Sequence, residues 1–470
     1  MTGIYTPRTK IVCTLGPSTA TDDAIRGLIE AGMNVARVNF SHGTHEQHTE
    51  TIAMVRRLAE ETGKPIAILG DLQGPRIRIG DLPNPINLAV GQDVVLVAEG
   101  HEKGADIPVT YDQLAHDVKV GDRILINDGL IELVALEVRD GRVSARVLNG
   151  GELKSHKGLN LPGIQVSAPS ITEKDAADIR FAIEQQVDYL ALSFVRKAED
   201  IESLRSMIPK WLLIVAKIEK DVALQNIEAI IRSTDAVMVA RGDLGVELPF
   251  EAVPGAQKRI IRLSNKYGRP VITATQMLES MIEHPRPTRA EASDVANAIM
   301  DGTDAVMLSA ETAAGSYPRL AVEAMTRIIK EIELHPPTMP FAGAEQGDGV
   351  VTTEVAIAAA TVAAVGMLGA PLVVVFTKSG FTARVVSSKR PPVPILALTD
   401  EGRTFRQLAL VWGVVPELVP HCMDYDEMME RAKTAVVGRE LATPGDRIIV
   451  TAGVPFDMQG TTNLLKVETV

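Results

Sequence analysis

The sequence has few of the features that mark secreted or membrane proteins. It contains only 2 cysteines in 470 residues, Cys13 and Cys422, too far apart to indicate a disulfide framework or a zinc site. No segment approaches the roughly 18 uninterrupted apolar residues that a membrane helix needs, and residues 1–10 lack the apolar core of a signal peptide. We therefore expect a cytoplasmic protein with no membrane partner.

Positive charge is also scarce. The net charge is -12, and no run of lysines and arginines occurs, which argues against nucleic acid as a partner. An anionic substrate would need local positive charge, so isolated basic residues at strand ends deserve notice.

A repeated unit dominates the first two thirds of the chain: a short apolar run, a polar residue at its end, and a segment of helical period. Helix start signals include Thr21, Thr172 with Asp175, and Asp294. Eight strands alternating with helices predict an α/β fold with a (β/α)8 TIM barrel. The eight runs are 11–15, 34–39, 66–71, 189–194, 212–219, 236–243, 271–275 and 305–311.

The alternation of apolar runs and helical segments is interrupted by one insertion, and the pattern changes again near residue 335. Residues 75–165 alternate apolar and polar side chains, and Asp140-Gly141 is a hairpin signal, so we expect an inserted all-β lid domain on the third strand-to-helix loop, with no helix before Thr172. Residues 335–470 predict a C-terminal doubly wound α/β domain, with strands near 372–376, 395–398, 414–419 and 447–450. The barrel domain then comprises residues 1–74 and 166–334.

Charged residues stand at several predicted strand ends, where barrel enzymes place their catalytic groups. Lys217 and Glu219 are two residues apart and share a strand face, and Arg241 and Asp243 are expected to do the same on the next strand. Neighbouring strands lie about 4.8 Å apart, so Glu219 and Asp243 should face each other. The full set is Arg37, Asn39, Asp71, Ser193, Lys217, Glu219, Arg241, Asp243, Thr275, Ser309 and Glu311.

Two facing carboxylates repel unless a cation lies between them, and their hard oxygens favour Mg²⁺ or Mn²⁺. Lys217 beside such a cation could stabilise a transferring phosphoryl group. The alternative for these charges is a plain ion-pair network. Gly242 could offer N–H donors to a substrate carboxylate, and Thr275 could bind substrate, relay a proton or cap the following turn.

Six motifs together resemble the pyruvate kinase family, in the same order and with the same inserted domain. They are residues 9–17 (TKIVCTLGP), 33–43 (MNVARVNFSHG), 215–219 (VAKIE), 240–245 (ARGDLG), 274–279 (ATQMLE) and 307–313 (MLSAETA). The resemblance implies phosphoryl transfer from phosphoenolpyruvate to ADP, giving pyruvate and ATP, by an enzyme that is a homotetramer in this family.

The resemblance also implies roles for individual residues. Glu219 and Asp243 would bind Mg²⁺, and Lys217 would stabilise the transferring phosphoryl group and the enolate. The remaining roles are phosphate contact for Arg37; substrate binding for Gly242, Asp243 and Thr275, with Thr275 also on the protonation face; nucleotide contact for Asn39, Phe40, Ser41, His42, Arg78 and Lys157; and lid residues Asp128 and Lys157.

The chain departs from the family pattern beside its expected potassium site, formed by Asn39, Ser41, Asp71 and the carbonyl of Leu72. Most members have an acid where Arg76 stands, so its fixed charge could replace the ion and make K⁺ unnecessary. The alternative is that Arg76 turns to solvent.

The C-terminal domain also departs from the pattern. Its loop 377–382 resembles the family's sugar-bisphosphate loop, but the companion loop 452–460 has no Lys or Arg and contains Asp457. We therefore expect little or no activation by fructose 1,6-bisphosphate.

Two other readings of the sequence remain. One is a different Mg²⁺-dependent barrel enzyme acting on an enolate, such as an aldolase or a dikinase. The other is a non-catalytic nucleotide sensor.

Overall fold

The predicted barrel is confirmed. The computed structural model describes residues 7–164, 166–335, 351–422, 425–453 and 462–470. Eight parallel strands form a closed barrel in chain order, each hydrogen-bonded to the next and the last to the first. They are β1 (Lys10–Thr14), β2 (Val35–Asn39), β3 (Ala67–Asp71), β12 (Tyr189–Leu192), β13 (Leu213–Ile218), β14 (Ala236–Ala240), β15 (Val271–Ala274) and β16 (Ala305–Leu308).

The strands are apolar on both faces because both faces are buried. In β1, Val12 points into the barrel interior, whereas Ile11 and Cys13 join the cluster between strands and surrounding helices. Val35 and Val215 occupy the same interior layer on β2 and β13. Side chains two apart along a strand share a face, so this register fixes which residues face the barrel mouth.

The surrounding helices start largely where capping residues predict. Thr21 caps the first helix through the N–H of Ala24, and Thr172 forms a capping box with Asp175. The expected start at Asp294 is wrong, because Thr288 caps that helix through the N–H of Glu291 and Asp294 lies inside it. The helices are α1 (Asp22–Ala31), α2 (His45–Thr62), α4 (Glu173–Glu184), α5 (Ala198–Met207), α6 (Asp221–Gln225), α7 (Ile227–Ser233), α8 (Arg241–Glu247), α9 (Val253–Lys266), α10 (Arg289–Met300), α11 (Ala310–Ala313) and α12 (Pro318–Leu334).

Several strands end earlier than the apolar runs suggested. The largest differences, of three residues each, are at 241–243, which form the first turn of helix α8, and at 309–311, where Ser309 precedes and Glu311 lies in helix α11. The prediction that Arg241 and Asp243 share a strand face is therefore wrong. On a helix, residues two apart point in different directions.

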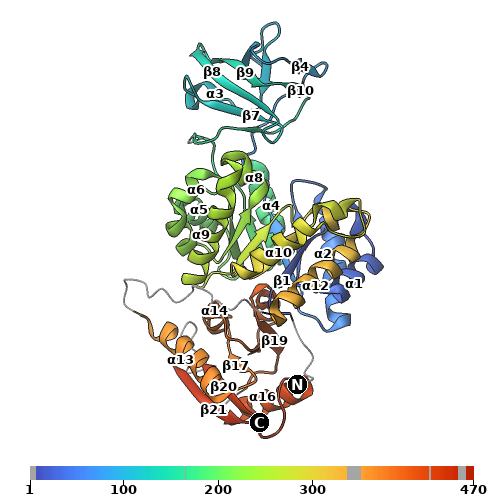
Figure 1. The fold of residues 1–470 in the computed structure, drawn as a ribbon, viewed down its shortest axis with the longest axis vertical. Helices are drawn as coiled ribbons and strands as arrows, with labels where there is room; N and C mark the ends of the chain where they lie inside the picture. Colours follow the sequence, from blue (N-terminus) through green and yellow to red (C-terminus); the bar gives the residue numbers. More distant parts are fainter. Residues whose placement is uncertain (1–6, 165, 336–350, 423–424, 454–461) are drawn as a thin grey trace.

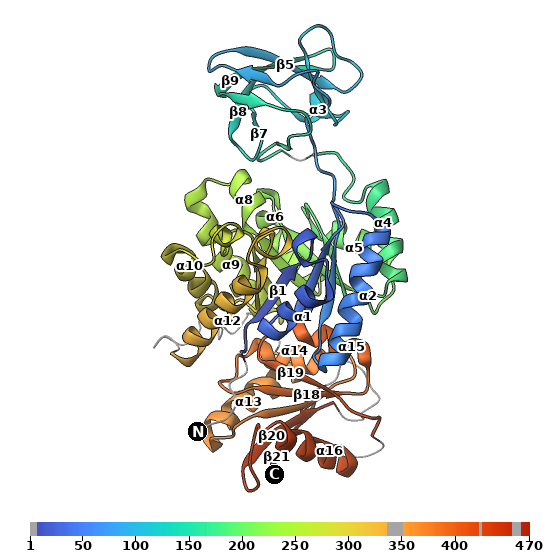
Figure 2. The same cartoon turned by 90° about the vertical axis from the view of Figure 1, so that its right-hand side faces the viewer.

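The insert is a separate β structure above the barrel mouth in both views (Figure 1, Figure 2). The expected hairpin is present, and Asp140 and Gly141 both have positive φ, 52° and 75°, as its turn requires. One short helix was not predicted. The elements are β4 (Ile86–Leu88), β5 (Asp93–Ala98), β6 (Ile107–Val109), α3 (Leu114–Asp117), β7 (Arg123–Ile126), β8 (Ile131–Arg139), β9 (Arg142–Asn149), β10 (Gly151–Leu153) and β11 (Leu159–Asn160).

A single buried carboxylate joins the two chain segments that connect the insert to the barrel. Asp175 accepts a hydrogen bond from the backbone N–H of Gly74, just after β3, at 3.0 Å. Its other oxygen accepts from the N–H and hydroxyl of Thr172, just before α4, at 2.9 and 2.6 Å. Asp175 is fully buried, so it fixes the exit and the return of the chain at one point.

The C-terminal sheet is parallel except for one antiparallel edge strand, β21, which we did not predict. Helices α13 and α14 pack on one face and α16 on the other, as a doubly wound sheet requires. The expected loops at 336–350 and 454–460 lie outside the described residues. The elements are α13 (Thr353–Leu368), β17 (Val373–Phe376), α14 (Phe381–Ser388), β18 (Ile395–Thr399), α15 (Gly402–Gln407), β19 (Val414–Leu418), α16 (Tyr425–Gly438), β20 (Arg447–Ala452) and β21 (Leu464–Thr469).

This C-terminal part covers the end of the barrel opposite the insert (Figure 1). Ala409 and Leu410 join the interior cluster of the barrel, and the Tyr189 hydroxyl donates to the carbonyl of Gln407 at 2.6 Å. The C-terminal part therefore covers one end of the barrel, and the mouth at the other end faces the insert (Figure 1). Within the described ranges, no helix is both long and apolar enough to cross a bilayer.

Candidate active site

The polar residues at the barrel mouth continue the inward-facing columns of the strands. Arg37 follows the interior residue Val35 by two positions, and Lys217 follows Val215 by two. Asp71 likewise follows the inward-facing Leu69 by two positions, and Ser193 follows Ala191 by two. Because side chains alternate along each strand, these four groups form one polar layer on top of an apolar interior.

Asp71 lies at the centre of this layer, between two cations. One oxygen accepts from Arg37 Nε at 2.7 Å, and the other is 3.3 Å from Lys217 Nζ. Burial alone would raise the pKa of this carboxyl, but Lys217 and Arg37 together outweigh it and hold the pKa below its usual value. Asp71 is therefore an anion that fixes both basic side chains. Arg37 is held further by the Thr14 hydroxyl at 2.9 Å.

Lys217 is fastened from three sides. Its ammonium lies 2.9 Å from Glu219 Oε1 and donates to the Ser193 hydroxyl at 2.7 Å, in addition to the Asp71 contact. Burial acts to lower the pKa of Lys217, but Asp71 and Glu219 reverse the shift, so the net direction is upward. The amine is thus protonated at neutral pH and only 12% exposed. A fixed, nearly dry positive charge is suited to stabilising negative charge that develops on a substrate.

Glu219 and Asp243 form the acidic half of the site. Burial raises the pKa of Glu219, and the negative charge of Asp243 raises it further, against the opposing effect of Lys217. Asp243 therefore acts on Glu219 from the first turn of helix α8, and the prediction that the two carboxylates face each other across neighbouring strands is wrong. Glu219 also accepts from the backbone N–H of Phe194 at 2.6 Å.

This donor set fits a hard divalent cation with open positions. In the described part of the chain, no group of three or more His, Cys, Asp or Glu side chains is arranged to hold a metal. Two carboxylates are nevertheless the usual protein contribution to Mg²⁺, which takes its remaining ligands from water and substrate oxygens. The repulsion between Glu219 and Asp243 is the observation that a cation would relieve.

Arg241 does not join this group, contrary to our inclusion of it among the charges at the strand ends. Its guanidinium is 2.7 Å from Asp294 and donates to the carbonyls of Ala274 and Thr275 at 3.3 and 2.7 Å. It is therefore a structural residue that fastens helix α8 to the end of β15. The strand model failed here because helix formation at residue 241 turns its side chain outward.

Thr275 and Gly242 are in direct contact. The Thr275 hydroxyl accepts from the N–H of Gly242 at 2.8 Å and donates to the carbonyl of Ala274 at 2.6 Å. The suggestion that Thr275 caps the following turn is thus replaced by a link to α8. Thr275 and Gln276 have φ of 67° and 53°, a conformation that costs energy for residues with side chains and concentrates at functional sites.

The nucleotide residues that the resemblance implied lie in two places. Asn39, Ser41 and His42 form the turn after β2, where Asn39 Oδ1 accepts from the N–H of Ser41 at 3.1 Å. The Phe40 side chain is buried, its N–H donates to the carbonyl of Asp71 at 3.0 Å, and its carbonyl accepts from Lys174 at 2.6 Å. Arg78 and Lys157 belong to the insert, where the Arg78 guanidinium donates to the carbonyl of His156 at 3.0 Å.

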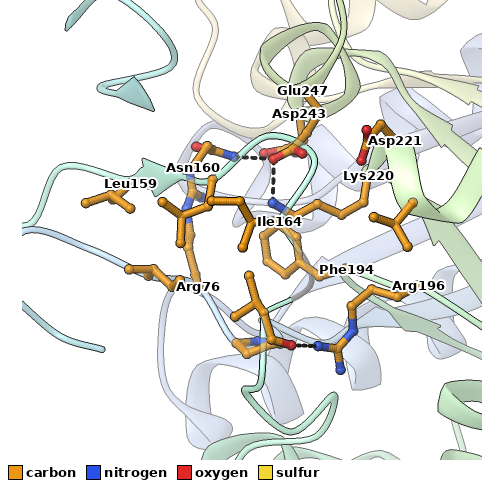
Figure 3. A pocket seen from close by; sticks show the side chains of 15 residues that line it. Arg76, Leu159, Asn160, Ile164, Phe194, Arg196, Lys220, Asp221, Asp243 and Glu247 are labelled. Atoms are coloured by element: carbon orange, nitrogen blue, oxygen red, sulfur yellow. Dashed lines mark hydrogen bonds and ion pairs between the residues drawn. The ribbon is translucent and has the colours of Figure 1, made fainter. Parts of the chain in front are cut away.

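The expected potassium ligands also surround the mouth. Asn39 and Asp71 are register partners on β2 and β3, and the carbonyl of Leu72 accepts from the Ser193 hydroxyl at 2.7 Å. Arg76 extends toward the insert, with its guanidinium 3.9 Å from Asp128. It also lines a cleft between the insert and the barrel (Figure 3).

Sequence reasoning missed three residues that the structure brings into contact with the site. Thr14 holds Arg37, as the predicted Ser193 holds Lys217, and its position two residues after the inward-facing Val12 was the available signal. Phe194 contributes only its backbone N–H to Glu219, which no side-chain pattern reveals. Glu247, on α8, pairs with Lys220 in the cleft (Figure 3).

The fold and this site define a (β/α)8-barrel enzyme with a layer of charged side chains at its mouth, beneath an inserted β domain. Family models described as "Pyruvate kinase, barrel domain" and "Pyruvate kinase, alpha/beta domain" match residues 6–322 and 355–468. The chain belongs to the pyruvate kinase family, whose members are transferases that use Mg²⁺.

Individual relatives agree with the family models. A pyruvate kinase from Geobacillus stearothermophilus is 46% identical, covering 98% of this chain and 80% of its own length. One from Agrobacterium vitis is also 46% identical, covering 98% and 96%. A crystal structure of a pyruvate kinase from Cryptosporidium parvum superposes with a TM-score of 0.94 at 36% identity, covering 98% of this chain and 96% of that one.

Proposed function

We propose that this enzyme transfers the phosphoryl group of phosphoenolpyruvate to ADP, giving ATP and an enolate that is protonated to pyruvate. The observation that carries the proposal is Lys217, a buried ammonium fixed by Asp71, Glu219 and Ser193 beside a pair of repelling carboxylates. Such a charge is preorganised, so it costs no reorganisation when negative charge develops in the transition state.

The residues divide the work as follows. Arg37 binds the phosphate, because Asp71 and Thr14 hold its guanidinium at the mouth. Lys217 stabilises the transferring group and the enolate oxygen. Glu219 and Asp243 would hold Mg²⁺, which would supply positive charge against the negative charge of the substrate. Gly242, Asp243 and Thr275 hold the substrate's carboxylate end, and Thr275 lies on the face that is protonated.

Nucleotide binding is assigned to both sides of the mouth. The turn formed by Asn39, Phe40, Ser41 and His42 would contact ADP from the barrel, and Arg78 and Lys157 from the insert. Closure of the insert would complete the site and exclude water that could accept the phosphoryl group. We further propose a cytoplasmic homotetramer, on the family resemblance alone, which light scattering would test against the 50.5 kDa chain.

The assay for this function is pyruvate release from phosphoenolpyruvate and ADP with Mg²⁺ present, coupled to a pyruvate-consuming reaction. Activity that requires all three components supports the proposal. An inactive, folded protein would contradict it and would favour a nucleotide sensor, whereas activity on another enolate-forming substrate would favour a different barrel enzyme.

We also propose that the enzyme does not require K⁺, because the guanidinium of Arg76, once turned toward the expected ion site, would supply the positive charge of the ion. Its 38% exposed side chain is paired only loosely with Asp128 at 3.9 Å, so it is able to turn inward. At saturating Mg²⁺, rates in potassium and in tetramethylammonium buffer are expected to agree within about twofold. A large stimulation by K⁺ would contradict the idea, and Arg76→Gln should lower the rate in tetramethylammonium specifically.

Fructose 1,6-bisphosphate is expected to leave the enzyme unchanged. The segment after β17 offers hydroxyls, and that of Thr382, in the first turn of α14, bonds that of Thr462 at 2.8 Å. The companion loop lies among undescribed residues, but its sequence contains Asp457 and no basic residue, so a second phosphate would be poorly held. Titration of the sugar into the assay tests this; a clear fall in the substrate concentration for half-maximal rate would overturn it.

A further inference from the structure

A second charged pair lies beside the two cation carboxylates. Lys220 follows Glu219 directly in the chain, and Glu247 lies one helical turn after Asp243 on α8. Lys220 Nζ and Glu247 Oε1 are 2.5 Å apart, and the two side chains are only 17% and 1% exposed. The ion pair therefore connects the same two segments that carry Glu219 and Asp243.

Phe194 links this pair back to the cation site. Its backbone N–H donates to Glu219 at 2.6 Å, and the Lys220 ammonium lies 5.6 Å from the centre of its ring. Phe194 has a φ of 54°, which is uncommon for a bulky residue. In this conformation its N–H contacts Glu219 and its ring contacts Lys220, the next residue in the chain. Glu219 and Lys220 are therefore held by one neighbour.

The insert reaches the same carboxylate. Asn160 of β11 donates from Nδ2 to Glu247 Oε1 at 3.4 Å, a long and weak hydrogen bond (Figure 3). The second oxygen, Oε2, is buried and has no hydrogen-bond partner among the residues that the structure describes. The negative charge of Glu247 is therefore balanced mainly by the ammonium of Lys220.

The position of α8 needs such a contact. The helix has seven residues, and its first turn carries Asp243, which is repelled by Glu219 in the absence of a cation. A buried ion pair holds its segments strongly as long as both charges are present, because loss of one leaves the other unpaired in a low-dielectric environment.

We propose that Glu247, through its ion pair with Lys220, is a positioning residue that holds α8 so that Asp243 and Glu219 stay at the separation that a divalent cation requires. This inference rests on the proposed function and adds to it a pair outside the ligand set. Removal of a group that orients metal ligands without touching the metal commonly weakens metal binding by about 10-fold to 100-fold.

The test is Mn²⁺ binding to the full-length protein without substrate, followed by electron paramagnetic resonance of the free ion. Glu247→Gln keeps the side-chain size and is expected to raise the Mn²⁺ Kd about tenfold or more. Glu228→Gln, the same change in an exposed ion pair with Arg232 on α7, should leave the Kd unchanged. The double variant Lys220→Met/Glu247→Gln removes both charges and should bind Mn²⁺ more tightly than Glu247→Gln but more weakly than the wild type. Lys220→Arg keeps a positive charge at this position and should retain most of the wild-type affinity.

A general structural role would give a different pattern. If Glu247→Gln lowers the Tm but leaves the Mn²⁺ Kd as in the wild type, or if the double variant binds Mn²⁺ more weakly than Glu247→Gln, the inference is overturned. Should Glu247→Gln fail to fold, Lys220→Arg and the double variant still decide the question. Because Mn²⁺ binding is measured without turnover, failure of the proposed activity in the wild type would be seen separately, in the pyruvate assay.

Discussion

Replacement of Lys217 by methionine is expected to lower kcat by about 10²–10³-fold or more, with a much smaller change in the KM for phosphoenolpyruvate. The reason is that the ammonium, fixed 2.9 Å from Glu219 and 3.3 Å from Asp71, acts on charge that appears only in the transition state. Steady-state rates of pyruvate release at saturating Mg²⁺ measure the effect. A variant with the full wild-type rate would show that Lys217 takes no part in the chemistry.

Stability has to be followed in the same experiment. Without Lys217, Asp71 keeps Arg37 as its partner, but Glu219 loses the one cationic contact that it has among the described residues. We expect a lower Tm, by circular dichroism, together with a folded spectrum. Lys210→Met provides the matched control, since Lys210 is exposed just before β13 and should change neither kcat nor Tm.

Glu219→Gln is expected to reduce activity at ordinary Mg²⁺ by about 10³-fold, corresponding to several kcal/mol of lost charge stabilisation. The amide keeps the shape but removes one of the two anionic ligands. Chelation of the metal from the wild type should have an effect at least as large, which added Mg²⁺ reverses.

The thermal stability of this variant distinguishes a ligand from an ordinary buried acid. The pKa of Glu219 is raised by burial and by Asp243, so the neutral side chain removes a repulsion in the metal-free protein. The Tm without metal is therefore expected to stay the same or rise, while the increase in Tm caused by Mn²⁺ in the wild type is lost. A variant still stabilised by Mn²⁺ to the wild-type extent would contradict the assignment.

The barrel was predictable because its strands are short apolar runs, most of them followed by a helix, and some of these helices begin at a recognisable cap. Thr21 and Thr172 start helices where their sequence patterns indicate. Periodicity did not fix the ends of the strands, since an apolar run does not distinguish the last residue of a strand from the first turn of a helix. Residues 241–243 were placed on the wrong element for this reason.

The site was predictable to the extent that it depends on strand alternation. Lys217 and Glu219 do lie on one face, and Asp243 does act on Glu219. Contacts between distant segments were not accessible: the position of Asp71 between Arg37 and Lys217, and the outward turn of Arg241, depend on barrel register and helix geometry. The roles of individual residues stay predictions until they are measured.

Asp175 has a consequence for the evolution and folding of the chain. It holds Gly74 and Thr172 on a single carboxylate, so about a hundred residues of intervening chain leave and return at nearly the same place. The entropic cost of closing a loop grows only slowly with the length of the loop. Here residues of the barrel, and not of the insert, make the contacts that close it. The insert can therefore change in size or sequence among relatives without altering the register of the strands beneath it.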